Sequence, residues 1–472
     1  MADIATPPPT AGGFNRVLGK LDMTLFTVCA VLVVDTLAAS ALIGPSSLTW
    51  WLITLVVFFV PYGLMTAELG AAYPGEGGIQ QWIQRAFGDR WAGRIAWYYW
   101  INVALWMPSA YILFAGMFAQ LFWPDMTLWA KIALCVALTW GTVGIGILSM
   151  DISKWVPNVG ALLKAAIMLL IGGAGIVYWL QNGSANEISL ETLTPSWSAG
   201  LSFLPIIVYN FLGFELMSGA GGEMKNPGRD VPFAVITAGV LIALFYLVAT
   251  FGMLVALPVA DIGLIEGLLD TVAKLLGDSD IAKVVVIVVG IGALYTFVAN
   301  MVTWTMGANR TAQAAAEDGE LPGVFRAVHP VYKTPVAAFV LTGIVSTAVI
   351  LAYGFIAGSA EDLFWTLFAF SSIIFLLPYL ALFPAFVALR RNDPATPRPY
   401  RAPGGTVFLT GMAAVCALFI LQAVVFFVWV PGEPVDWSKT GPILGGVLLT
   451  LLIGEAIVWT SDTRRRAAKA TV

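Results

Sequence analysis

The sequence predicts an all-α polytopic membrane protein with twelve transmembrane helices, and its composition is the first indication. Of the 472 residues, 59% are apolar and only 11% are charged, whereas about a quarter of the residues in an ordinary soluble domain carry a charge. Since a membrane span takes about 20 residues, the apolar residues suffice for about a dozen spans. The net charge is −4, without a basic domain, so the lipid bilayer, and not nucleic acid, is the expected partner.

The apolar residues form twelve segments separated by short polar ones, and each segment is long enough to cross a bilayer. The predicted spans cover residues 23–44, 49–72, 94–122, 128–148, 156–180, 201–221, 233–257, 281–307, 336–356, 363–389, 407–430 and 442–460. Residues 1–22 then form an N-terminal segment, residues 23–461 a single transmembrane domain, and residues 462–472 a C-terminal tail.

The positions of Lys and Arg predict the orientation of the spans, because cytoplasmic segments carry an excess of both. If the N-terminus lies in the cytoplasm, most of the 24 Lys and Arg residues fall in cytoplasmic segments. The outer segments hold only Lys131, Lys274, Lys283 and Lys439. Both termini of this multi-pass plasma-membrane protein are therefore predicted to be cytoplasmic.

The residues that could bind a metal or perform catalysis are too few and too scattered for either purpose. The three cysteines, Cys29, Cys135 and Cys416, lie in separate spans, and the single histidine, His329, lies in a cytoplasmic segment. Such a set lacks the ligand spacing of a metal site. Paired catalytic carboxylates, a Gly-rich phosphate loop and a Ser-His-Asp combination are also missing from the sequence. We therefore expect no enzyme, no cofactor and no metal site.

Two carboxylates at membrane depth are the strongest candidate functional residues, because a charge there is costly. Asp35 lies about 18 Å into the first span and Glu215 about 21 Å into the sixth, at about 1.5 Å per residue. Small residues accompany both, at 36–40 and at Gly213, and favour broken helices, which are tolerated at this depth where they line a cavity. The alternative for Asp35 is a carboxylate without a substrate contact, neutralised by protonation or by a neighbouring helix. The alternative for the segment around Glu215 is a glycine face for helix packing.

Lys164 is the third charge at membrane depth, about 14 Å into the fifth span. Because desolvation disfavours the charged form of a lysine, Lys164 is a candidate proton carrier. A static partner for a buried carboxylate is the other interpretation, and the two do not exclude each other. Glu68, near a span end, fits either a gate ion pair or an interface charge, and Glu455 fits a structural or oligomer-contact residue.

The two candidate breaks are five spans apart, so the sixth span enters the membrane from the side opposite to the first. This arrangement is typical of inverted-topology repeats around a site at the membrane midplane. The repeats would be residues 23–180 and 201–389, with 407–460 as two appended helices. Half-helix N-termini suit a substrate carboxylate and half-helix C-termini suit an amine, so a small zwitterion would fit both.

Several motifs identify a family resemblance that extends from the first span to the tenth. The chain resembles the amino acid–polyamine–organocation superfamily, and most closely its bacterial glutamate/GABA-antiporter-like permeases. The motifs are Val-Pro-Tyr-Gly-Leu at 60–64, Ala-Glu-Leu at 67–69, Pro-Gly-Glu-Gly-Gly at 74–78, Gly-Phe-Glu at 213–215, Glu-Met-Lys-Asn-Pro-Gly-Arg-Asp at 223–230, Asn-Arg at 309–310, Asp-Gly-Glu-Leu-Pro at 318–322 and Pro-Tyr-Arg at 399–401.

The resemblance implies two inverted five-helix repeats that work by alternating access in a bacterial cytoplasmic membrane. It implies that Glu215 couples substrate binding to gating and that Tyr209 is an aromatic gate over the substrate. It also implies that Lys164 occupies the position where proton-coupled members carry a lysine in place of a sodium site. Proton coupling without sodium is the resulting expectation.

The chain departs from the family pattern in the first span. Members that bind an amino-acid backbone usually have a Gly-x-Gly break there, whereas this chain has Leu37-Ala38-Ala39-Ser40. The preceding Asp35-Thr36 pair is similar to that of some bacterial putrescine importers. Less bare backbone and an added anion favour a substrate with an exposed amine.

The sequence therefore predicts a proton-coupled secondary active transporter of amino acids or amino-acid-derived amines, acting as a symporter or an exchanger. A polyamine or biogenic amine importer is the alternative within this class. A non-transporting membrane sensor is the hypothesis from another class, and the lack of a segment long enough for a soluble domain argues against it. The predicted substrate-binding residues are Asp35, Ala38, Ala39, Ser40, Trp106, Tyr209, Asn210, Gly213, Glu215, Asn300, Trp304 and Ser371, and those for proton coupling are Asp35, Lys164 and Glu215.

Overall fold

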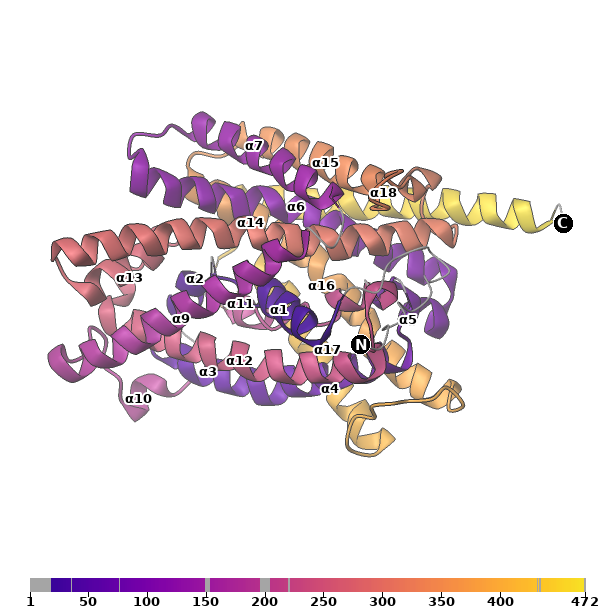
Figure 1. Cartoon of the computed structure of the whole chain (residues 1–472), viewed down its shortest axis with the longest axis horizontal. Coiled ribbons are helices and arrows are strands. Elements are labelled where there is room, and N and C mark those ends of the chain that lie inside the picture. Colours follow the sequence, from indigo (N-terminus) through magenta and orange to yellow (C-terminus); the bar gives the residue numbers. More distant parts are fainter. Residues whose placement is uncertain are drawn as a thin grey trace, which may run out of the picture.

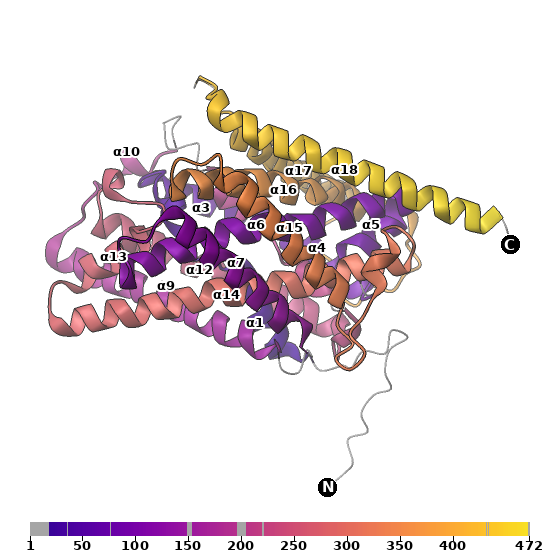
Figure 2. The same cartoon turned by 90° about the horizontal axis from the view of Figure 1, so that it is seen from above.

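The computed structural model describes residues 18–470 apart from 35, 76, 149–152, 196–203, 220, 431 and 433. The predicted site residue Asp35 thus lies outside the described residues. The described chain is helical, and its one extended pairing is an isolated bridge between Leu18 and Met224. Figures 1 and 2 show long helices that run mainly along the long axis of the molecule.

Ten of the described helical segments are long and apolar enough to cross a membrane. They are Ser46–Ala72, which joins α3 (Ser46–Thr54) through a short π-helix to α4 (Val60–Ala72), α6 (Asp89–Phe122), α7 (Leu128–Ile147), α9 (Trp155–Asn182), α12 (Pro227–Ala256), α14 (Asp280–Glu317), α15 (Val336–Gly354), α16 (Ala360–Asn392), α17 (Thr406–Val428) and α18 (Trp437–Ala470). Shorter helices α5 (Ile79–Phe87), α10 (Leu190–Leu193) and α13 (Gly267–Leu276) lie between them.

The other two predicted spans are interrupted helices, so the described chain has ten continuous candidate spans and not twelve. The segment 23–44 contains α1 (Lys20–Val31) and the short α2 (Leu37–Ala41). The segment 201–221 contains α11 (Leu204–Tyr209) and, after six residues without regular helix, a 3₁₀ turn over Leu216–Gly219. None of these short helices is long enough to cross a membrane alone. The interruption of the first segment comes one turn earlier than its small residues suggested.

Gly213 makes the interruption after α11 possible. Its φ of 112° lies in a region that residues with a Cβ rarely adopt. A Cβ built on Gly213 would also approach the Trp304 ring to 2.8 Å. The glycine therefore provides both the turn and the close contact with α14.

Several predicted spans were shorter than the observed helices. The eighth predicted span ended at 307, whereas α14 continues to Glu317. The added turns are polar but buried, and Arg310 in them donates to the Glu223 carboxylate at 3.1 Å with both side chains nearly inaccessible. Hydropathy detects the apolar part of a helix, whereas here buried polar contacts extend the helix beyond it.

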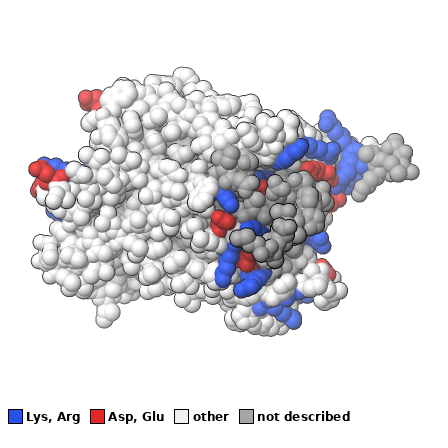
Figure 3. Space-filling view, viewed as in Figure 1, with Lys and Arg blue, Asp and Glu red and all other residues white. Residues whose placement is uncertain are grey.

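On the face that Figure 3 shows, Lys and Arg side chains gather mainly at one end of the molecule, where α18 extends past the other helices (Figure 2). We call this the arginine-rich end, and it carries Arg90, Arg310, Arg390, Arg398 and Arg465. The first described residue, Leu18, also lies there, since its backbone bonds to Glu223 and Lys225. Both described ends of the chain are thus on the same side.

Candidate functional site

Glu215 is held by three tyrosine hydroxyls that come from three different helices. Tyr99 of α6 and Tyr379 of α16 donate to its Oε1 at 2.8 and 2.7 Å, and Tyr62 of α4 donates to its Oε2. The Tyr62 hydroxyl in turn accepts the backbone N–H groups of Gly213 and Phe214 at 3.2 Å each. The carboxylate therefore ties the interrupted segment to three long helices.

This arrangement makes the tyrosine contacts sensitive to any cation that reaches the carboxylate. An ionised carboxylate only accepts hydrogen bonds, whereas a protonated one must also donate one. A proton on Glu215 would therefore require one of the three hydroxyls to turn or move away. An ammonium group on the substrate would likewise compete with the hydroxyls for the same oxygens. Binding at Glu215 is thus linked to the packing of α4, α6 and α16.

An aromatic cluster adjoins Glu215. The ring of Tyr209 lies 6.2 Å from that of Trp106 and 5.3 Å from that of Phe375, and Trp304 contacts both Trp106 and Phe375. The cluster continues to the tyrosines, because Phe375 lies 5.2 Å from Tyr379. Aromatic faces next to a carboxylate are the chemistry that recognises organic cations.

Two buried N–H donors in this region have no hydrogen-bond partner among the described residues. They are Nε1 of Trp106 and Nδ2 of Asn210, and both residues are 1% exposed. Since buried donors in proteins are nearly always paired, such groups are candidates for contacts with substrate acceptor atoms. A carboxylate or hydroxyl on the substrate would satisfy them.

The broken end of α1 is capped by side chains from three other helices. Lys164 of α9 donates to the Cys29 carbonyl at 2.6 Å, Trp304 to the Ala30 carbonyl at 3.0 Å, and Tyr246 to the Val31 carbonyl at 2.9 Å. The last carbonyls of a helix have no partner within it, and its C-terminus attracts a cation. Lys164 thus places its ammonium where a half-helix end favours positive charge, and it also donates to Asn300 Oδ1 at 2.9 Å.

The two interruptions are in direct contact. Thr36, between α1 and α2, donates to Asn210 Oδ1 at 2.7 Å, directly after α11. Residues 174 positions apart are thereby joined at the two broken helices. A movement of either half-helix would be transmitted to the other.

The structure brings together most of the described residues of the predicted site. Trp106 contacts both Tyr209 and Trp304. Asn210 and Gly213 adjoin Glu215 in the interruption, and Asn300 binds Lys164. Ala38, Ala39 and Ser40 lie within α2, where the Ser40 hydroxyl donates to the Leu37 carbonyl. Ser371 lies on α16 and donates to the Phe368 carbonyl of the same helix.

The described residues of this site are closed to the exterior. None of the predicted side chains for which the structure gives an exposure exceeds 5%, the value for Tyr209. A substrate can reach Glu215 only if helices or side chains move. Closure of the site between two access states is what alternating access requires.

The three tyrosines around Glu215 were not among the predicted site residues. Each is a polar residue in an apolar helix and is at most 1% exposed. The sequence signal was available, because a tyrosine in mid-span needs a partner for its hydroxyl. The sequence could not tell that all three share one partner.

Glu68 forms ion pairs with two arginines at the arginine-rich end. Arg390 binds it with two bonds of 2.8 and 2.5 Å, Arg398 donates at 3.1 Å, and the Ala402 N–H donates at 2.8 Å. The Glu68 side chain is 2% exposed. The carboxylate therefore fastens the segment after α16 to α4. Glu455 pairs with Arg94 at 2.5 Å, which fits its structural interpretation.

We predict that Glu68→Gln lowers the stability of the folded protein. Two nearly buried guanidinium groups would lose their counter-charge, and breaking a buried pair typically costs about 3–5 kcal/mol. The midpoint of thermal unfolding in detergent measures this loss. Lys283→Gln, which breaks an exposed pair with Asp280, is the control and should cost less than about 1 kcal/mol. Equal midpoints for the two variants would contradict the prediction.

A second polar contact at this end involves Glu320, which follows α14. Burial raises its pKa to about 8, and nearby Asp318 and Asp89 raise it further, against a hydrogen bond from Gln80 at 2.6 Å and the charge of Arg465. The carboxyl therefore holds its proton more tightly in the folded than in the unfolded chain. Its contribution to stability is complete below its ordinary pKa and is lost as the pH rises to about 8.

We therefore predict that Glu320→Gln is more stable than the parent protein at pH 9 and equally stable at pH 4. Because glutamine does not ionise, the variant does not lose folding stability as the pH rises. Unfolding midpoints across this pH range measure the effect, and Glu317→Gln at an exposed neighbouring position is the control. A difference between parent and Glu320→Gln that does not depend on pH would refute the explanation.

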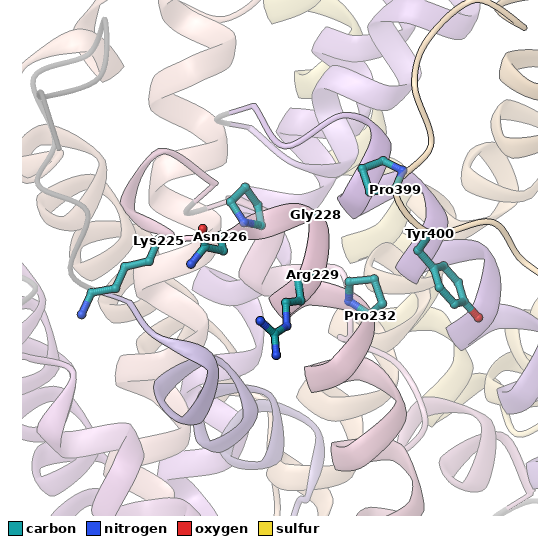
Figure 4. A pocket seen from close by; sticks show the side chains of 8 residues that line it. Lys225, Asn226, Gly228, Arg229, Pro232, Pro399 and Tyr400 are labelled. Carbon is teal, nitrogen blue, oxygen red and sulfur yellow. The ribbon is translucent and has the colours of Figure 1, made fainter.

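The Asn-Pro-Gly-Arg motif has a structural explanation. Asn226 and Pro227 begin α12, and Gly228 allows Pro399 to approach, since a Cβ there would lie 3.1 Å from Pro399 Cγ. These segments border a pocket of about 690 Å³ that Lys225, Arg229 and Tyr400 also line (Figure 4). None of its lining residues belongs to the predicted site.

Comparisons with known proteins agree with this geometry. A family model described as amino acid permease matches residues 18–452. The chain is 33% identical over 451 residues to the probable agmatine/putrescine antiporter AguD of Lactococcus lactis subsp. lactis (strain IL1403), which covers 93% of this chain and 95% of the relative. It is 24% identical over 444 residues to the branched-chain amino acid permease BcaP of Bacillus subtilis (strain 168), covering 88% of this chain and 90% of the relative.

The fold is also similar to that of a solved transporter. A crystal structure of the Eremococcus coleocola manganese transporter, in complex with an aromatic bis-isothiourea substituted compound, matches with a TM-score of 0.56. The two chains are 13% identical, and the match covers 95% of this chain and 94% of the other. At this identity the likeness concerns the fold alone. The chain therefore belongs to the amino acid permease family and is a multi-pass membrane transporter of amino acids or amines, not an enzyme.

Proposed function

We propose that this permease exchanges amines derived from amino acids, such as diamines and guanidino amines, across the membrane. The observation that carries the proposal is the Glu215 carboxylate, whose partners Tyr99 and Tyr379 lie against the rings of Trp304 and Phe375. A desolvated cation over an aromatic face gains about 2 kcal/mol, and a carboxylate adds a charge-assisted hydrogen bond. The similarity to an agmatine/putrescine antiporter supports the same substrate class.

The proposal includes proton coupling through Lys164. Its ammonium lies at the broken end of α1, where it donates to the Cys29 carbonyl, and it also donates to Asn300 on α14. Loss of its proton would remove a charge that stabilises the α1 carbonyls and would loosen the half-helix. Glu215 is the second proton-binding group in this scheme, and Asp35 is the third.

The proposal also keeps the predicted orientation and repeats. Cytoplasmic termini are supported by the arginine-rich end, which contains both described ends of the chain. Inverted repeats over 23–180 and 201–389 are supported by the two interruptions five spans apart, which meet at the bond between Thr36 and Asn210.

Transport of amino acids is the second candidate, and one observation favours it. The unpaired N–H groups of Trp106 and Asn210 would suit a substrate carboxylate, which an amino acid has and a diamine lacks. The similarity to a branched-chain amino acid permease agrees with this candidate. In that case Glu215 would hold the α-amino group.

Exchange assays with purified protein in liposomes distinguish the two candidates. We expect liposomes loaded with putrescine to take up labelled agmatine faster than liposomes loaded with buffer. Leucine and glutamate inside the liposomes should not produce this stimulation. If putrescine did not stimulate uptake of labelled agmatine but internal leucine stimulated uptake of labelled leucine, the amino acid candidate would replace the amine proposal. Absence of stimulation in both assays would contradict both candidates.

A further inference from the structure

Two adjoining pockets lie on the outside of the helix bundle at the arginine-rich end, away from Glu215. The first has a volume of about 470 Å³ and is lined by charged residues of α6 and α18. The second has a volume of about 550 Å³ and is lined by apolar residues of α6, α16 and α18. Phe87 and Trp91 line both. The two pockets therefore form one recess with a charged part and an apolar part.

Arginines outnumber carboxylates in the charged part. Arg90, Arg465 and Arg466 all lie within 3.5 Å of one carboxylate, that of Asp462. The Arg90 and Arg466 side chains remain 46% and 70% exposed. Each guanidinium has five N–H donors, more than one shared carboxylate can accept. This part therefore suits an anion with several acceptor oxygens, such as a phosphate.

The other two carboxylates nearby have arginine partners of their own. Asp89 pairs with Arg465 at 2.7 Å, and Glu455 pairs with Arg94 at 2.5 Å. They hold α6 against α18 and leave Arg90 and Arg466 as the accessible cations. The excess positive charge in the recess thus comes from these two side chains.

The apolar part lies among α6, α16 and α18, which are long and apolar enough to cross a membrane. Leu377 and Ala381 of α16 and Leu451 of α18 line it, and Trp91 at its edge is 49% exposed. Aromatic residues of this kind gather at the level of lipid headgroups. With Trp91 at the headgroup level, Arg90, which directly precedes it, would lie there too, and the apolar lining would lie next to the acyl chains.

We propose that this recess binds an anionic phospholipid, with its phosphate on Arg90 and Arg466 and an acyl chain along α16 and α18. Basic pockets between spanning helices on the cytoplasmic side are suited to acidic headgroups. The apolar part distinguishes a lipid from a soluble phosphate, which would use the arginines alone. The bound lipid would hold the oblique helix α18 against α6 and α16, with which it packs (Figure 2).

Lipid binding to the delipidated full-length protein tests the proposal without reference to transport. Phosphatidylglycerol and phosphatidylcholine with identical acyl chains are compared by native mass spectrometry, and inorganic phosphate is a third ligand. We expect retention of phosphatidylglycerol only. The double variant Arg90→Gln/Arg466→Gln should bind it about 30-fold more weakly, since each cation near an acidic headgroup contributes about a fivefold factor.

Two further variants make the result decisive. Arg391→Gln/Arg464→Gln removes the same charge from exposed positions outside the recess and should leave phosphatidylglycerol binding unchanged. Ala381→Trp fills the apolar part while keeping the arginines, and it should also weaken binding. Equal loss in both double variants, or an unaffected Ala381→Trp, would overturn the proposal. Displacement of the lipid by millimolar inorganic phosphate would overturn it too, because a headgroup anion alone would then suffice.

Discussion

Glu215→Gln is expected to abolish amine transport, because it removes the negative charge and replaces one of the two oxygens to which the three tyrosines donate with an NH₂ donor. The amide nitrogen of a glutamine would face a hydroxyl that needs an acceptor, and Tyr62 already accepts two backbone N–H groups. Unsatisfied buried groups cost about 1–3 kcal/mol, and the lost charge-assisted bond to the substrate about 1.5–3 kcal/mol. We therefore expect substrate affinity to fall about 100-fold or more, since 1.4 kcal/mol corresponds to about tenfold. Exchange in liposomes and direct binding measure this loss.

Variants of single tyrosines separate this explanation from general damage. Tyr99→Phe removes one donor to Glu215 and should reduce exchange about five- to tenfold, the value of one ordinary hydrogen bond. Tyr111→Phe, on the same helix, removes a buried hydroxyl that bonds to Thr142 and should leave exchange unchanged. If Glu215→Gln kept exchange within a factor of two, the carboxylate would not be part of the substrate site.

Lys164→Arg is expected to eliminate the pH dependence of transport. Arginine keeps the positive charge and the donors at the broken end of α1, but it is not deprotonated in proteins. The variant should still bind substrate but should not use a pH gradient to accumulate it. Uptake into liposomes with and without an imposed pH gradient measures the difference.

Asn300→Ala serves as the comparison for Lys164. It removes one hydrogen-bond acceptor of the lysine and leaves the titratable group in place. We expect its pH profile to shift and its gradient-driven uptake to persist. Full gradient-driven uptake by Lys164→Arg would show that the lysine acts only as a static cap for α1.

The membrane class, the two interrupted segments and part of the candidate site could be predicted from the sequence. Apolar length indicates a span, and a carboxylate at membrane depth such as Glu215 stands out because it is costly there. Trp106 and Trp304 were predicted from their positions in the third and eighth spans and contact each other. These signals are local to one segment, so a single sequence contains them.

The remaining features depend on which side chains meet across segments. Tyr62, Tyr99 and Tyr379 belong to helices far apart in the chain, and their common partner follows from packing alone. The same holds for Arg390 and Glu68, whose ion pair joins α16 to α4. The extension of α14 past residue 307 also depends on tertiary contacts, because its last turns are polar.

Binding of amines to the purified protein is the measurement that tests the central claim most directly. The thermal unfolding midpoint is followed for the parent protein and for Glu215→Gln with agmatine, putrescine, leucine or glutamate. We predict that agmatine and putrescine raise the midpoint of the parent protein, that glutamate does not, and that Glu215→Gln loses the response to amines. Stabilisation by glutamate without stabilisation by either amine would contradict the assignment of Glu215 and its aromatic neighbours as an amine site.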